Sequence, residues 1–355
     1  MDALGLRMTS LLLRGPARSS VADVVGWFGA MQAQEVNSVL WSLGCRLPGM
    51  TLEQINTALE DRTVLRTWPM RGTVHLVPAA DAHWMLDLMG VRMLAGAAKR
   101  RQTLGLDEKT AERAVEILGT ALTGGKRLTR AECLAALTEG GVEVSGQRGY
   151  HLLWYAAQRG VTAIAPHVGK DQTFVLLDDW VAKPRRPSRE EALAWIAERY
   201  FRGHGPAPRK DFVGWTGLTM TDCKAGIAAA GSALTTVDLD GVEMIMPSSL
   251  AALEGPAWHG LAGFDEYLLG YKDRALMVAP GDLDRIVPGG NGMFRATLVR
   301  DGRAVGVWTR AITRKGVTVT VEPLIDFTAR DREQIVAALE PYAAFLGLSL
   351  TVKNP

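Results

Sequence analysis

Polar side chains gather in the segment Met31-Gln32-Ala33-Gln34-Glu35-Val36-Asn37. The segment lies where one expected helix ends and the next begins. In an extended or first-turn geometry, residues two apart point the same way, which would bring the amides of Gln32 and Gln34 together. Such a pair can orient a polar group by its dipoles alone. The alternative is that these side chains only cap a helix.

A second dense mixture of aromatic, acidic and basic residues runs from Gly263 to Arg274, with Asn291–Phe294 further along the chain. Charged side chains are costly to bury, so the mixture favours a surface loop with a function. A salt-bridged turn without a function is the alternative.

The common catalytic signatures are absent from the sequence. There is no Gly-x-Ser-x-Gly, and the segment 119–126 misses the phosphate-loop spacing by one residue. None of the six histidines has a second His four residues later or a Cys at metal-knuckle spacing. Serine-hydrolase, nucleotide-binding and metal chemistry are therefore set aside, and neither a cofactor nor a metal is expected.

Length and composition indicate a globular protein. A chain of 355 residues is long enough for two or three domains, and 47% hydrophobic residues suffice for a core. No apolar run reaches the ~18 residues of a membrane span, and residues 1–14 resemble an amphipathic helix more than an export signal. The three cysteines, Cys45, Cys133 and Cys223, are widely spaced. We therefore expect a soluble cytoplasmic protein that uses no disulfides and binds no membrane.

The net charge of +2 does not by itself indicate a nucleic-acid-binding protein. A DNA-binding face would require the 40 basic residues to be segregated. Local basic clusters that allow this are Lys99–Arg101, Lys183–Arg189, Arg209–Lys210 and Arg314–Lys315. Solvated helix ends and linkers are the alternative reading of each cluster.

A unit of helices followed by two short β runs occurs about three times. The first copy is expected to have helices over 21–31, 35–43 and 52–59 and strands over 64–68 and 73–77. The second has helices over 110–122, 130–137 and 148–158 and strands over 162–165 and 173–177. After a linker at 183–189, the third has helices over 189–201, 209–215 and 221–230 and a hairpin over 234–246 that turns at Asp240-Gly241. This order is the plan of a winged helix-turn-helix.

The chain after Pro256 changes to a β-rich pattern. Strands are expected over 285–287, 296–300, 304–309 and 317–321, followed by a helix over 329–346 and a last strand. The fold class is accordingly α+β, with tandem winged-helix modules and a C-terminal β-rich subdomain. The expected boundaries are 1–95, 96–182, 183–255 and 256–355.

Several motifs in the same order resemble the tandem winged-helix proteins of the AlkZ/YcaQ type, a family that includes DNA glycosylases acting on alkylpurines and interstrand crosslinks. The resemblance covers nearly the whole chain. Its landmarks are Met31–Gln34, Arg66–His75, Tyr200–Pro206, Phe264–Arg274, Asn291–Phe294 and Asp301–Arg303. It implies a C-shaped fold that grips duplex DNA around a concave channel, with the wing at 63–78 and the 296–309 pair as candidates for entering a groove.

The resemblance also implies roles for individual residues. The family motif is Gln-apolar-Gln in one branch and Gln-apolar-Asp in the other, and Gln32-Ala33-Gln34 matches the first. Gln32 and Gln34 are therefore expected to hold the attacking water of a monofunctional glycosylase. The residues expected to contact DNA are Arg71, His75, Lys272 and Arg274, followed by Arg148, Arg185 and Arg186. His75 has the alternative of a buried core histidine.

Glutamines suffice for this chemistry when the leaving group is already cationic. An N7- or N3-alkylated purine carries its own positive charge and departs without a general acid, so the enzyme needs only to place water and stabilise an oxocarbenium-like centre. The expected partner is duplex DNA with alkylated purines, bound by a monomer. The cellular roles that the resemblance implies are base excision repair of alkylation damage and toxin self-resistance.

Two other classes of protein remain open. A non-catalytic transcriptional regulator would use the same modules, but the expected recognition helix 148–158 carries few base-reading groups beyond Arg148 and Gln158. A winged-helix interaction scaffold would leave the glutamine pair unexplained.

Overall fold

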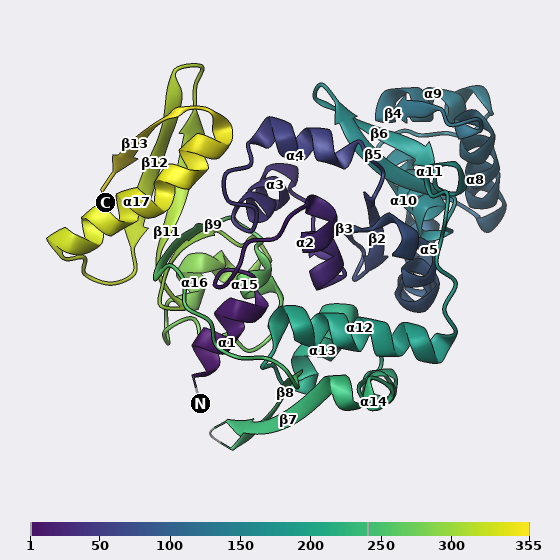
Figure 1. The fold of residues 1–355 in the computed structure, drawn as a ribbon. Helices are drawn as coiled ribbons and strands as arrows, with labels where there is room; N and C mark the ends of the chain where they lie inside the picture. Colours follow the sequence, from purple (N-terminus) through teal and green to yellow (C-terminus); the bar gives the residue numbers. More distant parts are fainter. Residues whose placement is uncertain (1, 240, 355) are drawn as a thin grey trace. The chain divides into compact units, whose positions relative to one another are not determined.

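The computed structural model describes residues 2–239 and 241–354, and these divide into two compact units. Unit 1 comprises residues 1–58, 193–215 and 219–355, and unit 2 comprises residues 59–192 and 216–218. Each unit mixes helices with mainly antiparallel strands (Figure 1), which confirms the mixed class. The expected division into four consecutive modules follows different boundaries. That division and the tandem winged-helix arrangement stay predictions.

The N-terminal part of unit 1 is helical. Its elements are α1 (Ala3–Ser10), α2 (Val21–Phe28), β1 (Met31–Gln32), α3 (Val36–Gly44) and the start of α4 (Leu52–Leu59). The helix expected over 21–31 ends early because Gly29 adopts a φ of 78°, which breaks the helix and frees Met31 and Gln32 to extend.

The middle of unit 1 follows the linker at 183–189. Its elements are α12 (Arg189–His204), α13 (Arg209–Thr216), α14 (Met220–Ala229) and the hairpin β7 (Leu234–Leu239) and β8 (Val242–Pro247), with Thr219 capping α14. Asp240, half of the expected turn, lies outside the described residues.

The C-terminal part of unit 1 is a five-stranded sheet in the order β13-β12-β11-β10-β9, with helix α17 packed on it (Figure 1). The strands are β9 (Trp258–Leu261), β10 (Ala296–Arg300), β11 (Arg303–Ile312), β12 (Gly316–Pro323) and β13 (Ser349–Lys353), and the helices are α15 (Glu266–Leu269), α16 (Leu283–Ile286) and α17 (Ala329–Leu346). A capping box of Thr328 and Asp331 begins α17, and Gly347 ends it in a left-handed conformation.

One expected strand in this part is wrong. Residues 285–287 belong to the short helix α16 and its end, where the amides of Ile286 and Val287 donate to the carbonyls of Asp282 and Leu283. A run of three residues is too short for its composition to distinguish the two conformations.

Unit 2 contains the strand order β3-β2-β5-β6-β4, all antiparallel neighbours. The strands are β2 (Val64–Met70), β3 (Thr73–Pro78), β4 (Arg127–Thr129), β5 (Thr162–Val168) and β6 (Asp171–Leu176). The helices are α5 (Ala82–Met85), α6 (Val91–Gly96), α7 (Ala98–Thr103), α8 (Glu108–Leu122), α9 (Arg130–Glu139), α10 (Arg148–Gln158) and α11 (Leu177–Trp180).

The sequence predicted the second repeat more closely than the other two. Its helices and hairpin occur in the expected order over 108–176, and β4, which the sequence did not indicate, pairs with β6. A capping box of Thr129 and Glu132 begins α9, as the Thr129 cap predicted. None of the helices among the described residues is both long and apolar enough to cross a membrane.

Candidate active site

Gln32 and Gln34 lie on the short extended segment that joins α2 to α3. Gln32 is buried, with 9% of its surface exposed, whereas Gln34 is exposed. The side-chain oxygen Oε1 of Gln32 is buried and accepts no hydrogen bond from any of the described residues. A buried acceptor without a donor costs about 1–3 kcal/mol. Such a group is often retained because a substrate or an ordered water supplies the missing partner.

Glu35 serves a different purpose from the two glutamines. Its carboxylate accepts from the amides of Asn37 (3.1 Å) and Ser38 (2.7 Å), and so caps α3. Arg310 lies 3.8 Å from the same carboxylate. Helix capping, the alternative explanation of the polar segment, therefore accounts for Glu35.

The backbone of Gln32 is held by Glu266, a residue that sequence reasoning did not single out. The amide of Gln32 donates to Oε1 of Glu266 at 3.0 Å. The other carboxylate oxygen, Oε2, accepts from the indole N–H of Trp215 at 3.1 Å and lies 3.1 Å from Nε2 of His204. Glu266 is 1% exposed and His204 is fully buried. This buried cluster of Glu266, His204 and Trp215 fixes the position of Gln32.

His204 is enclosed by aromatic rings. It stacks on Tyr200 with ring centroids 4.7 Å apart, and its Nδ1 lies 3.0 Å from the carbonyl oxygen of Tyr200. Both ring nitrogens therefore face oxygen atoms.

The charged stretch that begins at Gly263 divides into a buried half and an exposed half. Asp265 accepts two hydrogen bonds from the guanidinium of Arg46, at 2.8 and 2.9 Å, and both side chains are buried. The buried half is therefore a salt-bridged turn, which was the alternative interpretation of this stretch. Lys272 and Asp273 are exposed, and Arg274 is half-buried with its Nε bonded to the carbonyl of Leu268 at 2.8 Å. Burial lowers the pKa of Arg274 from its ordinary value.

The expected DNA contacts of the first wing lie on the β2–β3 hairpin of unit 2, with Arg71 in its turn and His75 on β3. Arg71 has a φ of 56° and places NH2 3.1 Å from Nε2 of His75. His75 is fully buried, and its Nδ1 lies 2.9 Å from the carbonyl oxygen of Thr73. To contact a phosphate directly, His75 would have to give up these two contacts. It can orient the side chain of Arg71 without giving them up. DNA binding by either residue stays a prediction.

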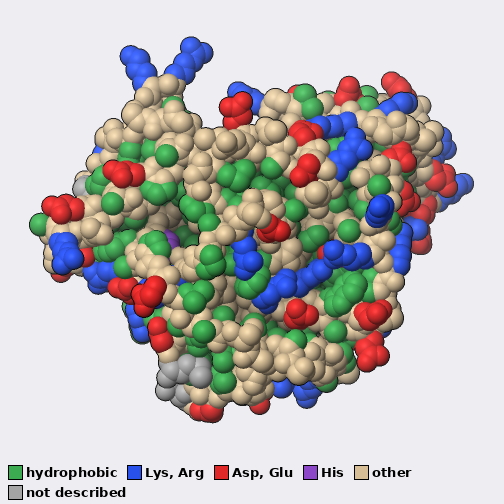
Figure 2. Space-filling view, in the orientation of Figure 1, with side chains coloured by type: hydrophobic (Ala, Val, Ile, Leu, Met, Phe, Trp, Pro, Cys, Tyr) green, Lys and Arg blue, Asp and Glu red, His purple; other side chains and the backbone are tan. Residues whose placement is uncertain are grey.

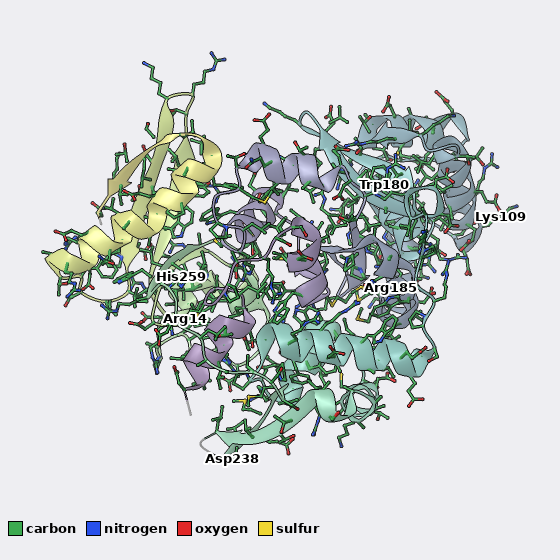
Figure 3. All side chains as sticks on the ribbon, in the orientation of Figure 1. Arg14, Lys109, Trp180, Arg185, Asp238 and His259 are labelled. Atoms are coloured by element: carbon green, nitrogen blue, oxygen red, sulfur yellow. The ribbon has the colours of Figure 1, made fainter. Side chains whose placement is uncertain are left out.

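The other three expected contacts are also in unit 2. Arg148 bonds the carbonyl of Leu104 at 2.7 Å and pairs with Glu143. Arg185, labelled in Figure 3, pairs with the buried Asp81 at 2.9 Å. Arg186 is exposed. Arg148 and Arg185 thus have structural partners, and their role on DNA is untested.

The hairpin of β11 and β12 presents a further basic surface in unit 1. Residues 311–315 at its end are exposed and include Arg314 and Lys315. Figure 2 shows basic side chains projecting where this hairpin ends in Figure 1. The sequence had indicated the basic pair but had placed the candidate hairpin at 296–309, one strand earlier.

Comparison with known proteins agrees with the motifs. The family described as DNA glycosylase AlkZ-like matches residues 25–345. An interstrand DNA cross-link repair glycosylase from Streptomyces sahachiroi is 29% identical over 324 residues, which cover 85% of each chain. The solved structure of Streptomyces sahachiroi DNA glycosylase AlkZ matches with a TM-score of 0.81 and 25% identity, covering 99% of this chain and 98% of that one. The family match spans most of the chain and includes the glutamine segment, and so this chain belongs to the AlkZ-like family of DNA glycosylases.

Proposed function

We propose that this chain hydrolyses the N-glycosidic bond of cationic N-alkylated purines in duplex DNA, with Gln32 and Gln34 positioning the attacking water. The observation that carries the proposal is the buried Oε1 of Gln32, which has no donor among the described residues and lies on a backbone that Glu266 holds in place. A fixed acceptor without a donor suits a water molecule that must be oriented toward a reacting carbon.

The reaction balances without a protein acid. The oxygen of water forms a bond to C1′ while the bond from C1′ to the purine nitrogen breaks. The bonding electrons neutralise the positive charge of the alkylated ring, and water releases a proton to solvent. The products are a neutral alkylpurine and an abasic site, so the enzyme is monofunctional. Glutamine dipoles stabilise the cationic sugar in the transition state.

The proposed mechanism uses no protein acid, and the role of Glu35 agrees with this. That carboxylate accepts two backbone amides at the start of α3 and is therefore occupied as a cap. A neutral base would need a proton donor in order to leave, and the proposed mechanism contains none. Selectivity for cationic lesions then follows from the chemistry and does not require steric exclusion of normal bases.

DNA binding is proposed to use phosphate contacts from exposed or half-buried basic side chains of each unit. In unit 1 these are Lys272, Arg274 and the tip of the β11–β12 hairpin, and in unit 2 they are Arg71 and Arg186. Because the relative from Streptomyces sahachiroi is named an interstrand cross-link repair glycosylase, we include crosslinks through N7 of guanine among the substrates. Each end of such a crosslink is a cationic purine.

The test is a panel of duplexes that each carry one lesion, scored for abasic sites after alkali. Excision is expected for N7-methylguanine and for a nitrogen-mustard adduct, but not for O6-methylguanine, uracil or hypoxanthine. Comparable release of the neutral bases would refute the water-positioning mechanism in favour of acid-assisted departure. Binding to every duplex without an abasic product would instead identify a non-catalytic DNA-binding protein.

A further inference from the structure

Arg66 is a buried cation in unit 2 for which the described residues supply no anion. Its side chain lies on β2, and only 7% of the residue is exposed. Its guanidinium has no ion pair, side-chain hydrogen bond or aromatic partner within the parts of the chain that the structure describes, and its nitrogen atoms keep some access to solvent. Burial lowers the pKa of Arg66 to about 10. Keeping a charge without a counter-ion at a largely buried position is costly.

Two further groups stand beside Arg66 at the end of β5. Arg66 pairs across the sheet with Ile164, and His167 follows three residues along the same strand, within the irregular stretch between Ala165 and Val168. Arg127 of β4 donates to the carbonyl oxygen of Pro166, the residue before His167. Burial, Arg66 and Arg127 all lower the pKa of His167, while Asp171 opposes them.

The charges of this cluster do not cancel. Arg127 is neutralised by Glu60, whose two carboxylate oxygens lie 2.8 and 3.1 Å from its guanidinium nitrogens. Asp171 is exposed at the far end of the β5–β6 turn. One guanidinium therefore remains uncompensated, with a half-buried imidazole nearby. Planar N–H donors in a partly dry setting match the oxygens of a phosphate group.

We propose that Arg66, flanked by His167 and Arg127, binds one phosphate group of the DNA backbone. This inference rests on the proposed function, because a duplex substrate supplies the phosphate. Arg66 lies on β2 of the wing hairpin but is not one of the expected DNA contacts, because Arg71 lies in the turn of that hairpin and Arg185 and Arg186 lie after β6. Free inorganic phosphate has the same chemistry and is the other possible source of the anion.

The first measurement is thermal unfolding without DNA, in a chloride buffer, for the wild type and for Arg66→Met. Methionine fills similar space without the charge. If Arg66 is kept for a ligand, the variant unfolds at the same temperature as the wild type or higher, because an unpaired buried charge has been removed. A lower unfolding temperature, or failure to fold, would assign Arg66 a structural role and overturn the proposal.

The second measurement is the salt dependence of binding to an undamaged duplex. Arg66→Met should reduce the slope of log K against log salt by about one unit and weaken binding on the order of tenfold. Arg66→Lys keeps the charge but not the planar fork, so it should keep the slope and lose part of the affinity. The matched control is Lys109→Met, which removes an exposed charge from the outer face of α8 in the same unit (Figure 3) and should resemble the wild type. An unchanged slope in Arg66→Met would overturn the proposal.

Inorganic phosphate separates the two sources of the anion. If phosphate raises the unfolding temperature of the wild type but not of Arg66→Met, while the two bind DNA equally, the site takes free phosphate and the DNA assignment is wrong. Neither readout requires base excision. A chain that binds DNA through Arg66 without releasing N7-methylguanine would refute the proposed function and leave this site standing.

Discussion

The surroundings of Arg46 and of Gln32 are neighbouring polar regions of unit 1 that are satisfied in opposite ways. Arg46 is 1% exposed and donates to Leu11, to Ser42 and to both oxygens of Asp265. Gln32 is almost as buried, but its side-chain oxygen has no donor among the described residues. The adjacent acids Asp265 and Glu266 serve these two regions, respectively. A saturated cluster stabilises the fold, whereas an acceptor without a donor is what the proposed water-positioning role of Gln32 requires.

The largest effect on stability is expected from breaking the saturated cluster. Asp265→Asn leaves the Arg46 guanidinium buried without its counter-ion, which should lower the free energy of unfolding by about 3–5 kcal/mol. Asp301→Asn is the matched control, because Asp301 meets Arg14 at 3.4 Å on the surface with 68% of its side chain exposed. That change should cost under about 1 kcal/mol. Equal effects in denaturant unfolding would contradict the assignment of the Arg46–Asp265 cluster to stabilising the fold.

Glu266→Gln tests whether Glu266 keeps Gln32 in the position that base excision requires. The substitution keeps an oxygen that can accept the amide of Gln32 but removes the charge facing His204 and Trp215. A displaced water-binding group should lower the single-turnover rate of excision by about tenfold or more, with duplex affinity unchanged. A loss of affinity that matches a loss of folded protein, with a normal rate per folded molecule, would make Glu266 purely structural.

Phosphate contacts should show smaller, uniform effects. Replacing Arg71, Lys272 or Arg274 singly with Ala should weaken binding to damaged and undamaged duplex alike. Each change should reduce the slope of log K against log salt by about one unit. If the slope is unchanged in all three variants, these residues belong to the structure and not to the DNA interface.

The smallest effect is expected from Glu35→Gln. Glutamine can still accept one backbone amide at the start of α3, so excision of N7-methylguanine should stay close to the wild-type rate across neutral pH. Loss of activity in this variant would identify Glu35 as a general acid. The assignment of helix capping to Glu35 and of catalysis to Gln32 and Gln34 would then be wrong.

Local signals in the sequence predicted the elements that contain them. The limits of α10 and α17 agree with the expected ranges 148–158 and 329–346, because glycines and caps mark helix ends within a few residues. The succession of short helices from Ala79 to Thr103, which includes a π-helical turn at Leu86–Gly90, has no comparable periodicity and was not predicted. Strand β9 was missed for the same reason.

The candidate site could be predicted only in part. The glutamine pair is contiguous in sequence and matches a family motif, so it was found. Glu266 lies 234 residues from Gln32 and 62 from His204, and nothing in the local pattern joins them. The same limit applies to Arg66, because the lack of a partner depends on every neighbour in space.

The most direct test of the account is single-turnover release of N7-methylguanine by the wild type and by the Gln32→Ala, Gln34→Ala double variant. Gln334→Ala, at an exposed position on α17, is the matched control. Water positioning predicts a rate lower by about 10²–10⁴ in the double variant, with the unfolding temperature and duplex affinity kept. A double variant that excises at the wild-type rate would contradict the assignment of the chemistry to these two glutamines.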